Sequence, residues 1–160
     1  NKKQDLVHNG VQTSGNLFAD NNYFSTSAKQ IIELELNNYK KKLTGTSDGV
    51  LLNWPSRFSL TAWLVSYNSG GNILPHIHEN GWVSGSIYIN APKRPDSESG
   101  NLVVSLDDSP YEASEKSDSK RVIDVKTGSL CLFPASLYHS TLPFESCEQR
   151  IVLAFDVNPI

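Results

Sequence analysis

The spacing of hydrophobic and polar positions changes about one third of the way along the chain. Residues 28–43 carry apolar side chains three and four positions apart, with three lysines near the end, where the helix dipole favours cations. A Ser-Thr-Ser run at 25–27 can supply the N-cap. This pattern predicts one amphipathic helix that supports a sheet. Residues 1–25 are polar and predict an irregular lead-in with at most one short strand.

From residue 50 onward, short runs rich in β-branched and aromatic residues alternate with turn residues. This texture is typical of a sandwich or barrel. We expect eight strands, at 58–67, 72–78, 82–90, 101–106, 121–125, 129–133, 137–142 and 150–157. The predicted fold class is all-β with a flanking helix, as a double-stranded β-helix of the jelly-roll or cupin-like kind. A length of 160 residues predicts a single domain, with 1–50 as lead-in and helix and 51–158 as the β-helix core.

Composition narrows the class of protein. Hydrophobic residues make up 38% of the chain and charged residues 19%, which is typical of a globular protein. The net charge of -3 offers no basic surplus for nucleic acid or an anionic membrane. We see no apolar run long enough for a membrane helix and no signal peptide, so we expect a cytoplasmic location. The two cysteines show no zinc-like or secreted pattern, which predicts free thiols.

Three of the four histidines form a pattern with chemical meaning. His76 and His78 stand two positions apart in a predicted strand, so their side chains point to the same face. Neutral imidazoles are good ligands for iron, zinc or copper. His139 can reach the same ion from a facing strand of a barrel. The pattern favours a three-histidine metal site over a pair of surface histidines, and His8 in the lead-in is given no role.

Arg150 and Tyr67 are candidates for binding a small acid. Arg150 begins the apolar strand RIVLAFDV, where a charge is costly to bury without an anionic partner. Its guanidinium can bind both oxygens of a carboxylate, although an exposed arginine at a strand end is the alternative. Tyr67 ends the first predicted strand, and it either packs in the core or donates its hydroxyl to the same carboxylate.

Four segments together resemble one enzyme family. In prolyl-hydroxylase-like iron(II)/2-oxoglutarate oxygenases, a Tyr, a Gly-bearing turn and a Pro-His lead into a His-x-Asp motif, and residues 67–78 read YNSGGNILPHIH. The run NGWVSGSIYIN resembles the next strand of a bacterial and phage branch, which reads like H-x-H-x-N-x-W-x-S-G-x-Y-Y. The segments GSLCLFPASLYHSTLPF and RIVLAFDV are similar to that branch's distal half. The resemblance covers roughly residues 50–157.

The resemblance implies a role for each matching residue. His76 matches the first ligand of Fe(II), and His139 matches the distal ligand. Arg150 matches the arginine that pairs with the far carboxylate of the cosubstrate 2-oxoglutarate, and Tyr67 and Tyr88 match tyrosines that can help to hold it. The implied reaction uses O2, releases succinate and CO2, and hydroxylates an unidentified small-molecule or peptide substrate. The implied fold, a double-stranded β-helix, agrees with the strand pattern.

Two positions depart from the family pattern. His78 stands where the His-x-Asp motif has its aspartate, so the site loses that ligand's negative charge. Glu79 or Asn80 is the alternative source of an oxygen ligand. Val152 stands two residues after Arg150, where many relatives carry Ser or Thr. Two further functions therefore stay open. One is a three-histidine cupin-type dioxygenase that binds its substrate on the metal without 2-oxoglutarate, and the other is a non-catalytic barrel that binds a metal or a small acid.

Overall fold

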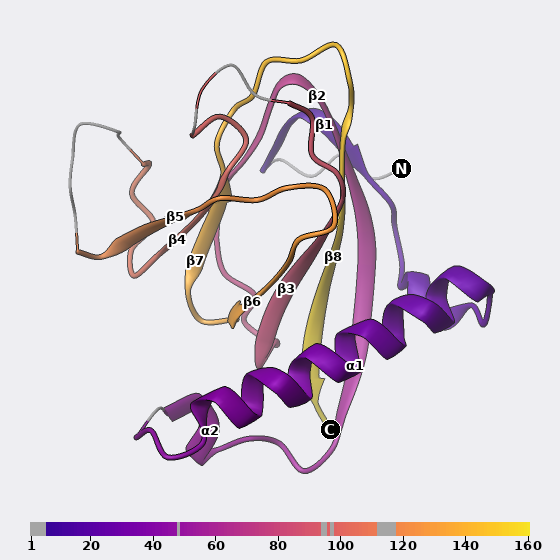
Figure 1. The fold of residues 1–160 in the computed structure, drawn as a ribbon, viewed down its shortest axis with the longest axis vertical. Coiled ribbons are helices and arrows are strands. Elements are labelled where there is room, and N and C mark those ends of the chain that lie inside the picture. The colour runs from indigo at the N-terminus through magenta and orange to yellow at the C-terminus, as the bar shows by residue number, and fades with distance from the viewer. Residues whose placement is uncertain (1–5, 48, 94–95, 97, 112–117) are drawn as a thin grey trace.

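Strands dominate the computed structural model, which describes residues 6–47, 49–93, 96, 98–111 and 118–160. In chain order the elements are β1 (Val7–Gln12), the 3-10 helix η1 (Leu17–Ala19), α1 (Tyr23–Leu43), α2 (Gly49–Leu52), β2 (Phe58–His76), β3 (Val83–Asn90), β4 (Leu102–Ser105), β5 (Lys120–Ile123), β6 (Leu130–Pro134), β7 (Tyr138–Thr141) and β8 (Arg150–Pro159). The predicted all-β fold with a flanking helix is confirmed (Figure 1).

The strands form one curled antiparallel sheet in the order β5-β4-β7-β2-β8-β3-β6, with β1 paired to β2. Strand β2 joins the two halves because it is 19 residues long. Its first part pairs with β8 as far as Tyr67, and its last part pairs with β7 at Ile73 and His76. Figure 1 shows β4, β5 and β7 on one side of the resulting half-barrel and β3 and β8 on the other. This is the predicted jelly-roll arrangement, and the predicted strands 58–67 and 72–78 are parts of one element.

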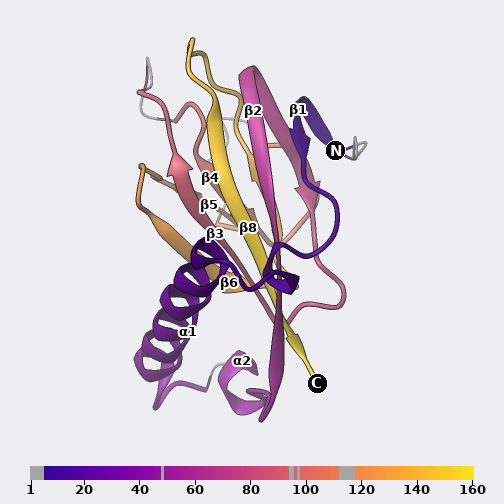
Figure 2. The same cartoon turned by 90° about the vertical axis from the view of Figure 1, so that its right-hand side faces the viewer.

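Alternation along the strands separates two hydrophobic clusters. On β8, Val152 packs into the inner cluster, whereas Leu153 and Phe155 pack into the cluster that faces the helix. Helix α1 contributes Ile32 and Leu36 to this second cluster, and both are almost completely buried. Figures 1 and 2 show α1 crossing the outer side of the sheet at its lower end. The helix therefore closes one face of the sheet and leaves the inside of the half-barrel for the polar residues described below.

The start of α1 differs from the predicted N-cap at 25–27. The cap is Asn22, whose side-chain oxygen accepts a hydrogen bond from the backbone N–H of Ser25 at 2.9 Å. Ser25 lies inside the first turn, and its hydroxyl donates to the carbonyl of Leu17 at 2.9 Å. The helix therefore begins at Tyr23, five residues before the predicted start at 28, and the buried Ser25 has a hydrogen-bond partner in the preceding segment.

Two expectations drawn from composition can be compared with the structure. Cys131 is half-buried and Cys147 is exposed, and both thiols are free, as predicted. Across the described ranges, no helix combines the length and the apolar character that crossing a membrane would require.

Candidate metal centre

The imidazole rings of His76, His78 and His139 meet inside the half-barrel. The ring centroids of His76 and His139 are 4.1 Å apart, those of His78 and His139 are 4.8 Å apart, and those of His76 and His78 are 5.1 Å apart. One potential ligand atom from each residue lies within 4.8 Å of the others. The structure thus brings together the three histidines that the sequence singled out.

Strand pairing explains how histidines so distant in sequence meet. His76 is the last residue of β2 and pairs directly with His139 on β7. His78 lies just beyond the end of β2, so its predicted place within a strand is wrong. Its backbone holds it in position, because its N–H donates to the carbonyl of Ala135 at 3.2 Å and its carbonyl accepts from Gly81 at 3.0 Å.

The Nδ1 atom of each ring faces an oxygen that can only accept a hydrogen bond. His76 Nδ1 lies 2.8 Å from the carbonyl oxygen of Leu74, and His139 Nδ1 lies 3.3 Å from that of Leu137. His78 Nδ1 lies 2.6 Å from a carboxylate oxygen of Asp156. Each Nδ1 must therefore carry the proton in the neutral ring, which leaves the lone pair on Nε2 for a metal. Such outer partners are a common feature of metal-binding histidines.

Burial favours the neutral form of His76 and of His139. Burial, and after it the neighbouring His76 and His78, lower the pKa of His139 to about 2. Burial also lowers the pKa of His76 from its ordinary value. A metal ion binds only the deprotonated nitrogen, so these histidines can accept a metal at neutral pH without first losing a proton.

The predicted oxygen ligands do not join the cluster. Glu79 and Asn80 are exposed on the turn that follows His78. Among the described residues, the group of converging ligands contains three histidines and no carboxylate. The nearest acid, Asp156, contacts His78 from the other side, and sequence reasoning missed it. A signal was present, because an acid inside the apolar strand RIVLAFDV is as unusual as the arginine at its start.

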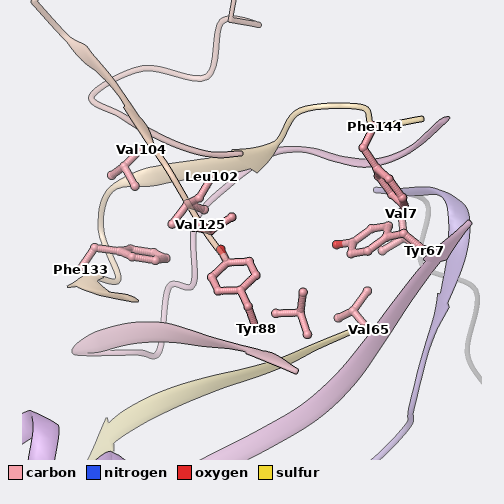
Figure 3. Packing of buried hydrophobic residues seen from close by; sticks show 10 residues of the cluster. Val7, Val65, Tyr67, Tyr88, Leu102, Val104, Val125, Phe133 and Phe144 are labelled. Atoms are coloured by element: carbon pink, nitrogen blue, oxygen red, sulfur yellow. The ribbon is translucent and has the colours of Figure 1, made fainter. Parts of the chain in front are cut away.

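A cavity extends from the histidines into the half-barrel. Its walls include Tyr67, Tyr88, Thr141, Val152 and Ala154 as well as the three histidines. Figure 3 shows the rings of Tyr67 and Tyr88 entering the same interior space from β2 and β3. Burial raises the pKa of Tyr67 to about 12, against the opposing effects of the Arg150 charge and of a hydrogen bond with Thr141. Burial also raises the pKa of Tyr88, so both hydroxyls keep their protons and can donate to an anion.

Arg150 is buried, with 2% of its surface exposed. It pairs across the strands with Tyr67, its Nη1 donates to the carbonyl of Gly100, and its guanidinium carbon lies 5.0 Å from the centre of the Tyr88 ring. The exposed arginine considered as an alternative is therefore wrong. The guanidinium lies against the Tyr88 ring, and Arg150 is not among the residues that line the cavity. The cavity is thus lined by three imidazoles and by two tyrosines, with the buried positive charge of Arg150 close to one of them.

An opening of about 540 Å³ connects the histidines with the surface. It is lined by His76 and His78, by Trp63 and Asp156, and by the segment 12–15 that follows β1. The Trp63 ring lies 5.5 Å from that of His78. A groove of similar volume, about 560 Å³, lies elsewhere and is lined by none of the three histidines. Of these two openings, the first is therefore the one that lies against the histidine cluster.

The match to a protein family agrees with this geometry. Residues 61–156, more than half of the chain, match the family described as "Putative 2OG-Fe(II) oxygenase". The chain belongs to this family, and the family is one of iron(II)- and 2-oxoglutarate-dependent oxygenases, as the sequence predicted. No curated protein matches the chain.

Solved structures of prolyl hydroxylases share the fold. A prolyl-4-hydroxylase from Pseudomonas putida is 15% identical, with a TM-score of 0.58 over 94% of this chain and 71% of that one. A Trichoplax adhaerens prolyl hydroxylase, solved with a peptide fragment of a hypoxia inducible factor, is 15% identical, with a TM-score of 0.62 over 98% and 66%. The viral collagen prolyl hydroxylase of Paramecium bursaria Chlorella virus-1 is 13% identical, with a TM-score of 0.57 over 94% and 78%. At these identities the likeness concerns the fold.

Proposed function

We propose that His76, His78 and His139 hold the Fe(II) of this 2-oxoglutarate-dependent oxygenase through their Nε2 atoms. The observation that carries the proposal is the convergence of three buried or half-buried imidazoles, each with Nδ1 directed to an acceptor. Three neutral nitrogen donors suit a divalent iron ion. When bound, iron with 2-oxoglutarate and O2 supplies the oxidising chemistry that hydroxylates a substrate and yields succinate and CO2.

The far carboxylate of 2-oxoglutarate is assigned to the end of the cavity marked by Tyr67, Tyr88 and Arg150. Tyr67 lines the cavity and keeps its proton, so its hydroxyl can donate to a carboxylate oxygen. The buried guanidinium of Arg150 adds a positive charge at short range in a poorly hydrated environment. The aliphatic side chains of Val152 and Ala154 line the wall between this end and the histidines, where they keep water out. Val152 in place of a hydroxyl residue leaves more of the binding to Tyr67 and Arg150.

The substrate is proposed to approach through the opening beside His76 and His78. Its walls mix the indole of Trp63 with polar groups of the segment 12–15 and the acid of Asp156. Its volume of about 540 Å³ admits a small molecule or the side chain of a peptide. A peptide occupies the related prolyl hydroxylase of Trichoplax adhaerens, and this favours a test of peptides beside small metabolites.

The decisive experiment is an anaerobic titration of the iron(II)-loaded protein with 2-oxoglutarate. A keto acid chelated to iron(II) gives a visible charge-transfer band, so we expect a band that appears and saturates. Succinate release then becomes the assay in a search for the substrate. Absence of iron binding would refute the metal site. Iron binding without the band would refute the role of 2-oxoglutarate.

A second candidate function keeps the metal and omits the cosubstrate. The lack of a carboxylate in the histidine group of the described residues is the observation that favours it, since three-histidine sites on related barrels can bind a substrate directly. Arg150 would then attract the substrate's own carboxylate. Oxygen consumption that is independent of added 2-oxoglutarate would select this function.

Two broader assignments complete the proposal. A single domain over residues 1–160 is supported by the inner cluster, which combines Val7 of β1 with Val152 of β8. A cytoplasmic location is supported by the two free thiols, Cys131 and Cys147, since free cysteines are typical of a reducing compartment.

A further inference from the structure

Asp156 forms a hydrogen bond with His78, and the described partners of the other two histidines are backbone carbonyl groups. Asp156 Oδ1 lies 2.6 Å from His78 Nδ1, and both side chains are largely buried, with 13% and 17% of their surfaces exposed. Ser84, which is 1% exposed, donates its hydroxyl to the same carboxylate oxygen at 2.7 Å. Its oxygen lies 3.2 Å from His78 Nδ1. The three groups form a closed network beside the cluster.

Strand register builds this network. Ser84 on β3 and Asp156 on β8 are directly paired residues, so their side chains project from the same face of the sheet. Asp156 lies six residues after Arg150, and the alternation of β8 places both on the inner face. The neighbouring pair is Gly85 with Phe155, where a Cβ atom on the glycine would lie 2.3 Å from Cζ of the ring. On β3, Ser84 thus supplies a hydrogen bond on one face of the sheet, and the next residue, Gly85, leaves room for the Phe155 ring on the other face.

Asp156 does not belong to the group of converging ligand atoms. Its place behind the ring of His78 suits a residue that acts through the histidine. His76 and His139 face neutral carbonyl groups in the equivalent position. Among the described hydrogen-bond partners of the three rings, the Asp156 carboxylate is therefore the only negatively charged group.

We propose that Asp156 is a positioning residue that fixes His78 with its proton on Nδ1, directs Nε2 to the metal, and supplies the negative charge that the three imidazoles lack. The inference rests on the proposed metal site. A carboxylate bonded to a ligating histidine orients the ring and makes its nitrogen a stronger donor. In a His-x-Asp motif the carboxylate binds the metal directly. In this arrangement the carboxylate of Asp156 instead contacts the ligating His78. Ser84 holds the carboxylate in the orientation that this requires.

The test compares metal affinity in variants of the full chain, using Co(II) as a visible probe of the site. Asp156→Asn keeps a hydrogen-bond acceptor and removes the charge, Asp156→Ala removes both, and Ser84→Ala frees the carboxylate from its donor. The matched control is Asp124→Asn, which removes an exposed acid paired with Lys126. We expect Asp156→Asn to weaken the Kd for Co(II) by about 10- to 100-fold. Asp156→Ala should weaken it further, Ser84→Ala less, and Asp124→Asn should leave it unchanged.

The outcomes separate this inference from the proposed function. Failure of the wild-type protein to bind Co(II) would refute the metal site itself. Wild-type binding with an unchanged Kd in Asp156→Asn would refute the role of the charge and leave the metal site standing. A residue of purely structural importance would instead lower the free energy of unfolding of the metal-free variant without changing its Kd. An acid reserved for the substrate would also leave the Kd unchanged.

A second measurement does not depend on a variant that folds. Long-range proton–nitrogen correlation spectra of the metal-free wild-type protein report which nitrogen of each histidine carries the proton. We expect the Nδ1–H form for His78. An Nε2–H form would overturn the proposal, because that ring would present a proton where the metal must bind.

Discussion

Lowering the pH should destabilise the metal-free protein because His139 is buried in its neutral form. Burial lowers the pKa of His139 to about 2, whereas the unfolded chain holds a histidine near the ordinary value of 6.5. Below pH 6.5 the unfolded chain therefore binds a proton that the folded protein does not bind. The contribution to stability is fully present above about pH 6.5 and is lost progressively as the pH falls from there towards 2.

The magnitude follows from proton linkage. Consider one histidine that gains a proton only in the unfolded chain. Lowering the pH from 7.5 to 5.5 then reduces the free energy of unfolding by about 1.4 kcal/mol. His76 adds to this loss, because burial lowers its pKa as well. Carboxylates and other groups titrate over the same range, so the contribution of His139 has to be isolated by comparison with a variant.

The assay is urea unfolding of the metal-free wild-type, His139→Gln and His8→Gln proteins at both pH values. His8 is exposed and lies outside the cluster, so its variant is the matched control for the loss of one histidine. We expect His139→Gln to reduce the pH-dependent loss of stability by about 1.4 kcal/mol, whereas His8→Gln keeps the full loss. An equal loss in the wild-type and His139→Gln proteins would refute the idea that burial holds His139 neutral.

Three further predictions address the site and the fold. His139→Ala should weaken Co(II) binding by more than the roughly 10- to 100-fold expected for an outer-shell change, since it removes a proposed ligand; retained stoichiometric metal in a titration would contradict the site. Arg150→Ala should raise the Kd for 2-oxoglutarate by on the order of 10- to 100-fold, because it removes the buried positive charge near the proposed carboxylate site, with metal affinity nearly intact; exposed Arg121→Ala is the control, and equal affinities would favour the cosubstrate-free function. Gly85→Ala should lower the unfolding free energy by about 1–3 kcal/mol, because the added methyl group meets the ring of Phe155, and an unchanged urea midpoint would show that the ring moves freely.

Local patterns explain which parts of the site could be predicted. The two-residue spacing of His76 and His78 and the apolar setting of Arg150 are visible in the sequence, and both pointed to residues that the structure buries or half-buries together. Asp156 carried the same kind of signal as Arg150, an ionisable group in an apolar strand. Its partner could not be inferred, because the contact with His78 joins residues 78 positions apart.

The fold class and the family could be predicted from the sequence, which also supplied the candidate ligands and the residues that we propose for binding an acid. The fold class follows from periodicities of two and 3.6 residues, and the family and the candidate residues follow from the resemblance of short motifs; both depend on neighbours along the chain. The pairing of His76 with His139 and that of Ser84 with Asp156 required the tertiary structure. Strand register and the packing of distant segments are set by contacts between residues far apart in sequence, so no local pattern contains them.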